Sequence, residues 1–133
     1  MYDIKFIAVD FDMTLSMNEG NFPECANPSE GFEVLKEFQN LGGKVILWTC
    51  REEEPLQMAI DFCKKQGLEF DAINEQLPEQ IQIGKMHGHK CTSRKLFADL
   101  YIDDKDPRSL TYGIDWELIR TMIIDLNIAL RAA

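Results

Sequence analysis

The chain has 133 residues, with 14 basic and 23 acidic side chains and a formal net charge of −9. A chain of this length can bury a sizeable core, so we expect residues 1–133 to form one domain. The acidic balance argues against a nucleic-acid surface, which needs a basic stripe. No apolar stretch approaches the ~20 residues of a membrane span and no signal-peptide pattern is seen, so cytoplasmic residence without membrane attachment is expected.

The first predicted element is a buried strand over the apolar run Phe6–Val9. The run Asp10-Phe11-Asp12-Met13-Thr14 follows it directly, so two carboxylates stand one residue apart after the strand. Two acids this close repel each other unless a cation, a proton or a phosphoryl group lies between them. Residues 16–26 are rich in Asn, Gly and Pro and predict a loop or small flap.

A helix is predicted next, with Asn27 as its cap, Pro28 in its first position and Glu30 as a capping-box acid. The pair Gly42-Gly43 is expected to end this helix. The apolar run Lys44–Thr49 then predicts a second buried strand.

The next segment predicts a second helix, which Pro55 can open and Gly67 ends. Phe70–Asn74 reads as a short third strand. Glu75–Arg94 is a long polar stretch, whose length suggests an active-site loop. The run His87–Cys91 within it lacks the usual spacing of zinc ligands, so it is expected to be a polar loop.

A fourth short strand is predicted at Leu100–Ile102, directly before Asp103-Asp104. The segment Asp115–Arg131 predicts a final helix. Its inward-facing residues are expected to be Leu118, Ile119, Met122, Ile123 and Leu126.

Alternating strands and helices predict an α/β fold, a Rossmann-like three-layer sandwich with a mostly parallel sheet. Right-handed crossovers place all the carboxyl ends of the strands at one edge. The residues expected at that edge are Asp10, Asp12, Thr49, Asn74, Asp103 and Asp104.

Carboxylates gathered in this way form a hard oxygen site of the kind that suits Mg²⁺. One aspartate could attack phosphorus, and a second, held partly protonated by its neighbours, could protonate the leaving oxygen and later activate water. A hydroxyl and a lysine would still be needed on the phosphoryl oxygens, and Thr49 and Lys95 are available for those roles.

These motifs resemble those of the haloacid dehalogenase-like (HAD) hydrolase superfamily, most of whose members are Mg²⁺-dependent phosphatases. Asp10–Thr14 matches the family's DxDxT motif, Val45–Thr49 its second motif and Leu100–Asp104 its fourth. The short spacings after the first motif and after Thr49 resemble the capless branch, without a separate cap domain. Capless members often act on larger molecules or borrow a neighbouring subunit, so the substrate could be small or large and a homo-oligomer is possible.

The resemblance implies that Asp10 is the nucleophile and a metal ligand. It makes Asp12 the general acid/base, with its main-chain carbonyl on the metal, and Thr49 a phosphoryl ligand. Asp104 most resembles the direct metal ligand, with Asp103 acting through water, although these two roles could be exchanged. The third motif is a lysine without fixed spacing, for which Lys95 is preferred and Lys85 and Lys90 compete.

Alternatives remain at this stage. Each acid could simply cap a loop or form a solvated turn. A non-enzymatic phosphate switch, such as a receiver domain, also has an acidic Mg²⁺ pocket, but its acids are adjacent and the Asp-x-Asp spacing differs. A silent binding module on the same fold would be expected to have lost one of the acids, and none is missing.

Overall fold

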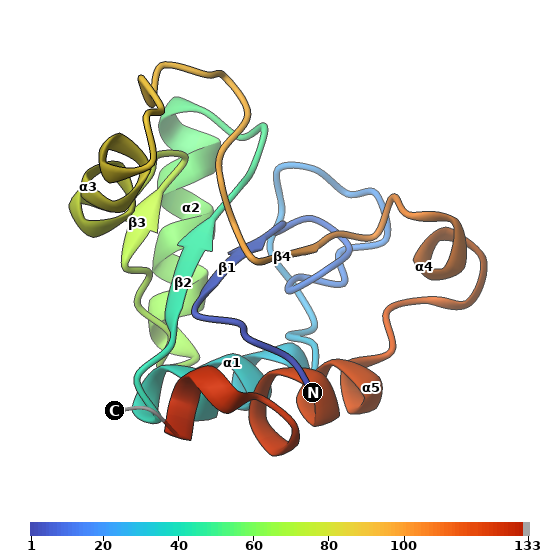
Figure 1. Ribbon diagram of the computed structural model, residues 1–133. Coiled ribbons are helices and arrows are strands. Elements are labelled where there is room, and N and C mark those ends of the chain that lie inside the picture. The colour runs from blue at the N-terminus through green and yellow to red at the C-terminus, as the bar shows by residue number, and fades with distance from the viewer. Residues whose placement is uncertain (132–133) are drawn as a thin grey trace.

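The computed structural model describes residues 1–131 and contains a four-stranded sheet in the order β3-β2-β1-β4, with every neighbouring pair parallel (Figure 1). The last two residues of the predicted domain lie outside the described residues. The strands are β1 (Phe6–Val9), β2 (Lys44–Leu47), β3 (Ala72–Ile73) and β4 (Leu100–Ile102). Val9 pairs with Leu47 on one side and with Ile102 on the other, so β1 lies between β2 and β4 with their carboxyl ends level.

Successive side chains of a strand point to opposite faces of the sheet, and apolar side chains of β1 lie on both faces. Both faces are therefore covered by other parts of the chain. Ile7 and Val9 pack into the larger core with α1 (Gly31–Asn40), α2 (Glu53–Lys65) and the C-terminal helices. Phe6 and Ala8 face the other way and pack with the segment that leads into α3 (Pro78–Met86). The predicted Rossmann-like three-layer α/β arrangement is therefore confirmed.

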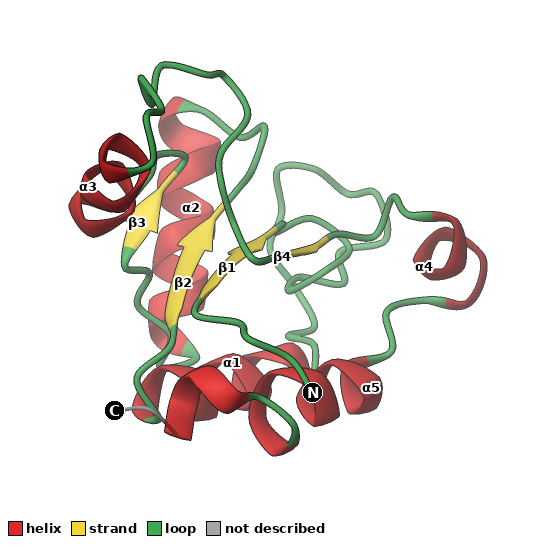
Figure 2. Cartoon of the chain, in the orientation of Figure 1, coloured by secondary structure: helices red, strands yellow, loops and turns green. Residues whose placement is uncertain are grey.

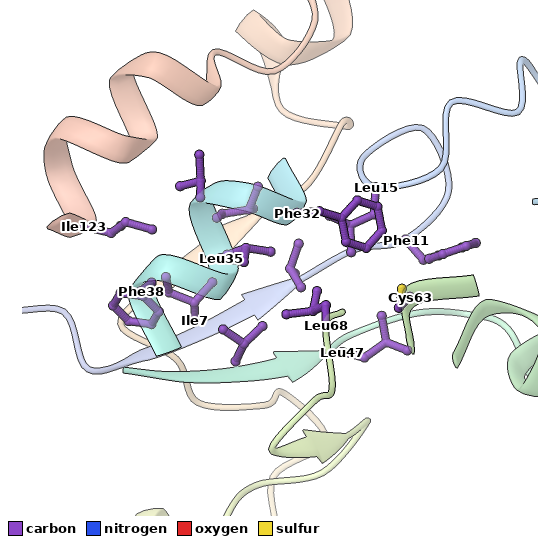
Figure 3. Packing of buried hydrophobic residues seen from close by; sticks show 14 of the residues in the cluster. Ile7, Phe11, Leu15, Phe32, Leu35, Phe38, Leu47, Cys63, Leu68 and Ile123 are labelled. Carbon is purple, nitrogen blue, oxygen red and sulfur yellow. The ribbon is translucent and has the colours of Figure 1, made fainter. Parts of the chain in front are cut away.

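The larger core forms because α1 carries apolar side chains on one face. Phe32, Leu35 and Phe38 are all buried, and in Figure 3 Leu35 and Phe38 lie over the strands while Phe32 lies beside Phe11. Phe11 and Leu15, which follow β1, are fully buried in the same cluster. The turn that carries the acidic motif is thus held in place by its own apolar residues.

The predicted start of α1 is wrong by several residues. Asn27 has a left-handed φ of 51°, Pro28 pairs with Ser16 in an isolated bridge, and the helix begins only at Gly31. Glu30 stands at the cap position but makes no capping hydrogen bond through its side chain. Residues 27–29 are tied to the turn after β1 instead, since the Ser29 hydroxyl donates to the Thr14 carbonyl (2.8 Å).

Two helices occupy segments that the sequence did not assign to helices. Within the predicted 75–94 loop lies α3, whose buried residue is the polar Gln80, and the loop proper is the stretch after Met86 (Figure 2). Pro107–Tyr112 forms α4, capped by the Asp106 carboxylate, which accepts from the Ser109 amide (2.9 Å). Neither helix has the apolar stripe on which sequence reading depends.

The predicted C-terminal helix is divided into α5 (Trp116–Arg120), a π-helical turn (Thr121–Asp125) and a 3₁₀ turn (Ile128–Arg131). Of the predicted inward residues only Ile123 is buried, while Ile119 and Met122 pack partly against the core. The predictions for Leu118 and Leu126 are wrong, because both are exposed. The π turn shifts the register, so that the stripe expected of a regular α-helix no longer faces one way.

Asn127, which is fully buried, joins the C-terminal segment to the residues that lead into β1. Its Oδ1 accepts from the Ile4 amide (2.8 Å), and its Nδ2 donates to the carbonyls of Ile4 and Ile123 (2.7 Å each). Removing this side chain leaves buried backbone groups without partners, each of which costs ~1–3 kcal/mol.

We therefore expect Asn127→Ala to lower the free energy of unfolding by about 2 kcal/mol. Urea unfolding followed by circular dichroism measures this loss. Thr121→Ala serves as the control, because the Thr121 hydroxyl makes a solvent-exposed hydrogen bond, donated to the Glu117 carbonyl one turn earlier. Equal small losses for both variants would contradict the role given to Asn127.

Candidate active site

The acidic motif begins where β1 ends. The Asp10 amide donates to the Ile102 carbonyl (2.9 Å), which extends the pairing of β1 with β4 by one residue. The chain then turns sharply: the amides of Thr14, Leu15 and Ser16 all point to the Phe11 carbonyl. This turn places the buried Thr14 hydroxyl so that it donates to Asp10 Oδ2 (3.2 Å).

Three carboxylates meet at this edge of the sheet. Asp10 follows β1, and Asp103 and Asp104 follow β4, and one oxygen from each lies within 4.8 Å of the others. All three residues are partly buried. The convergence follows from the parallel pairing of two adjacent strands, although some ninety residues separate them in the sequence. A set of three carboxylate oxygen donors matches the chemistry that Mg²⁺ prefers.

The electrostatics of this cluster oppose full ionisation. Burial, followed by repulsion from Asp103, raises the pKa of Asp10 from its ordinary 3.8 to about 7. Burial also raises the pKa of Asp103. A divalent cation among the three oxygens would remove this repulsion, so the cluster has the charge as well as the donor set for one.

The raised pKa predicts how stability depends on pH without added metal. Asp10 binds its proton more tightly in the folded state than in the unfolded state, where its pKa is near the ordinary 3.8. The proton therefore stabilises the folded state fully below pH 3.8, and this contribution is lost as the pH rises toward the folded-state pKa of about 7. We expect the wild type to lose stability relative to Asp10→Asn, which cannot ionise, across this range. Urea unfolding of both proteins in a chelator at several pH values measures the difference. A difference that stays constant with pH would contradict the shift.

Asp12 lies apart from the three clustered carboxylates, in an ion pair with Arg51. Arg51 Nε and Nη2 donate to Asp12 Oδ2 (2.9 Å) and Oδ1 (2.8 Å), and Asn18 Nδ2 donates to Oδ1 (3.1 Å). The partners of Asp12 are thus hydrogen-bond donors, and none of the three clustered acids is among them.

Arg51 is almost completely enclosed, with 3% of its surface exposed. Its Nη1 donates to the carbonyls of Pro23 (3.0 Å) and Pro55 (2.9 Å), which connects the flap to the first turn of α2. The guanidinium lies between the rings of Phe11 and Phe22, 4.8 and 4.9 Å from their centroids. The pKa of Arg51 is raised above its ordinary value, mainly by its hydrogen bonds to Asp12. The pairing of Arg51 with Asp12 could not be read from the sequence.

Thr49 lies just beyond the end of β2, beside the end of β1. The Trp48 amide donates to the Val9 carbonyl (2.8 Å), which aligns the two chain segments. Asn74 Oδ1 accepts from the Thr49 amide (2.8 Å), so Asn74 positions this residue from the end of β3. The Thr49 hydroxyl accepts from the Arg51 amide (3.1 Å) and is partly exposed.

Within residues 1–131, the preferred lysine, Lys95, forms no ion pair with the clustered acids. Lys95 Nζ is 5.4 Å from the centroid of the Tyr101 ring, and the side chain lines a cavity beside α3. Lys90 lines the same cavity, and Lys85 is exposed on α3. The lysine beside the cluster is Lys105, whose Nζ lies 3.7 Å from Asp104 Oδ2. Its position directly after the acid pair was the available signal.

A cleft of about 580 Å³ opens next to the acidic cluster. Asp104 and Thr14 line it on the side of the sheet, and α4 and the following turn form the far wall. Its remaining surface is mainly apolar, with contributions from Met13, Met17, Leu110, Ile114 and Trp116. Asp104 is the member of the acidic cluster that a ligand in this cleft would meet.

The fold and its acidic edge define an α/β protein with carboxylates gathered at the carboxyl ends of parallel strands. One solved structure that resembles it is described as that of a conserved protein coded by a locus of Bacteroides thetaiotaomicron. The two are 38% identical over 94% of this chain and 93% of the other, with a TM-score of 0.73. The chain belongs to the same family as this Bacteroides protein, whose description names no activity. No protein-family model and no curated protein matches the sequence.

Proposed function

We propose that the protein is a Mg²⁺-dependent phosphomonoester hydrolase that works through an aspartyl-phosphate on Asp10. The observation that carries the proposal is the convergence of Asp10, Asp103 and Asp104 within 4.8 Å, with Asp104 lining an open cleft. The HAD resemblance agrees with this proposal and remains a prediction. Magnesium would neutralise charge on the phosphoryl oxygens and reduce repulsion among the three carboxylates.

In the first half of the proposed reaction, a carboxylate oxygen of Asp10 attacks phosphorus and the bond between phosphorus and the leaving oxygen breaks. The Thr14 hydroxyl, which donates to Asp10 Oδ2, holds the nucleophile in one orientation. The exposed amine of Lys105 beside Asp104 and the hydroxyl of Thr49 are available to the phosphoryl oxygens. Water then cleaves the acyl phosphate and regenerates Asp10.

The proton balance requires an acid for the leaving oxygen and a base for the water, and the family resemblance assigns both roles to Asp12. Asp12 accepts two hydrogen bonds from Arg51, which makes its carboxylate a weaker base toward the attacking water. If Asp12 stays bound to Arg51 in this way, the phosphoryl group would persist on Asp10. This observation favours one second candidate, a phosphate-responsive switch without turnover.

Assays of p-nitrophenyl phosphate and a panel of metabolite phosphates test the proposal, with Mg²⁺ and with excess chelator. We expect phosphate release with Mg²⁺ and a loss of nearly all of it with the chelator. Stable labelling by acetyl phosphate without turnover would instead support the switch. Neither turnover nor labelling would contradict both functions.

The cleft is open to solvent, and only residues 48–52 lie between β2 and α2. We propose a phosphorylated substrate, small or large, and not a nucleic acid. No helix in residues 1–131 is long and apolar enough to cross a membrane. A cytoplasmic location and a homo-oligomer stay predictions.

A further inference from the structure

A second cavity, of about 530 Å³, lies beside α3 and between this helix and the segment that leads to β4. None of the three clustered carboxylates lines it, and its walls include Phe6, at the opposite end of β1 from Asp10. It is therefore separate from the cleft at the acidic edge. Its size falls within the range of small-molecule sites, ~300–1,000 Å³.

The charges around this cavity are opposite to those of the protein as a whole. The chain carries 23 acidic residues and a net charge of −9, yet no Asp or Glu is among the residues that line the cavity. Lys90 and Lys95 line it together with His87 and His89, the two histidines of the chain. Lysine ammonium and imidazole groups donate hydrogen bonds to oxyanions. The lining thus suits a ligand with negative charge.

The same cavity offers apolar contact. Phe6, Ile83 and Phe97 contribute to its lining, and Ile83 and Phe97 are 47% and 52% exposed. Apolar side chains with a few polar groups on one side are typical of sites for organic ligands. A metal site is not indicated here, because in residues 1–131 His87, His89 and Cys91 do not form a cluster of side chains that could hold a metal ion.

Specific contacts hold the two walls of the cavity together. The buried Gln80 accepts from the Leu77 amide through Oε1 and donates to the Phe97 carbonyl through Nε2, both at 2.8 Å. Cys91 Sγ donates to the Ile81 carbonyl (3.6 Å). It also lies so close to Gly84 that a Cβ there would be 2.7 Å away. The cavity is thus built by contacts between α3 and the segment that follows it.

From this arrangement we propose that the cavity beside α3 binds a small organic anion with an apolar portion, at a site distinct from the acidic cluster. The anionic group would bind to Lys90 and Lys95, and the apolar portion would pack on Ile83 and Phe97. The proposal does not depend on phosphatase activity, because it uses no residue of the acidic edge.

Fluorescence titration with 8-anilinonaphthalene-1-sulfonate, an apolar ring system with one sulfonate, tests the proposal. We expect saturable binding to the wild type and a ten-fold or greater weakening for Lys90→Gln/Lys95→Gln, about the loss of one charge-assisted hydrogen bond. Lys65→Gln/Lys85→Gln is the control, since it removes the same two positive charges from exposed lysines that do not line the cavity.

A second pair of variants changes the wall instead of the cations. Ile83→Glu places a carboxylate in the cavity and is expected to weaken binding at least as much. Met86→Glu adds the same charge to the same helix at a side chain that is 79% exposed and outside the lining, so it should change binding less than two-fold. Because all these side chains are exposed, the variants should fold.

Absence of saturable binding to the wild type would overturn the proposal. So would equal weakening by the cavity variants and their controls, which would show that the probe responds only to net charge. Weakening confined to the cavity variants would support it, whatever the outcome of the phosphatase assays.

Discussion

Asp10→Asn is expected to reduce Mg²⁺-dependent hydrolysis of p-nitrophenyl phosphate about a thousand-fold or more, because an amide oxygen cannot act as the nucleophile. The substitution keeps the size of the side chain and can still accept a hydrogen bond from Thr14. It also removes one charge from the acidic cluster, which should weaken the binding of the metal. Measuring kcat at saturating Mg²⁺ separates the two effects.

The matched control for this prediction is Asp61→Asn. Asp61 is exposed on α2, where its Oδ1 accepts from Gln57 (2.9 Å), and the substitution makes the same change in net charge. It should leave the rate within two-fold of the wild type. Equal turnover by Asp10→Asn and the wild type would remove Asp10 as the nucleophile, even if the protein proves to be a phosphatase.

Arg51→Met should cost about 4 kcal/mol of unfolding free energy, the scale on which breaking a buried ion pair is measured. The substitution leaves the Asp12 carboxylate without its guanidinium and removes the donors to the carbonyls of Pro23 and Pro55. A loss of this size is a large part of the ~5–15 kcal/mol that stabilises a typical protein. Denaturant unfolding measures it.

Arg108→Met provides the contrast, because Arg108 pairs with Asp115 at the surface (3.5 Å) and such a pair contributes ~0–1 kcal/mol. A double-mutant cycle with Asp12→Asn isolates the coupling between Arg51 and Asp12. Arg51→Lys should recover only part of the loss, since an ammonium cannot make the bidentate contact. If Arg51→Met were no more destabilising than Arg108→Met, the buried pair would not stabilise the fold as argued.

Much of the sheet could be predicted because its strands are short apolar runs. Phe6–Val9 and Leu100–Ile102 were located to the residue, and parallel pairing implied that Asp10 and Asp103 would meet. The helix α3 could not be foreseen in the same way. It is fixed by a buried glutamine and its hydrogen bonds, a contact that leaves no periodic apolar pattern.

The details of the candidate site were harder to predict than its location. The pair between Asp12 and Arg51 depends on how the flap folds between Phe11 and α2, and no spacing rule connects residues 39 positions apart. The preference for Lys95 relied on family spacing alone. The structure places that lysine beside Tyr101, because its segment packs against α3 before entering β4.

The position of β4 has a consequence for how the protein folds. This strand pairs with β1 alone, and the pairing joins residues that are more than ninety positions apart in the sequence. Contacts so distant in sequence close a large loop and form slowly compared with local ones. In a chain that has paired only β1, β2 and β3, Asp10 is already at the edge of the sheet, but Asp103 and Asp104 have not yet been brought beside it. We therefore expect the acidic cluster to assemble in the last stage of folding. Fully folded molecules would then bind a divalent ion at this cluster, and partly folded molecules would not.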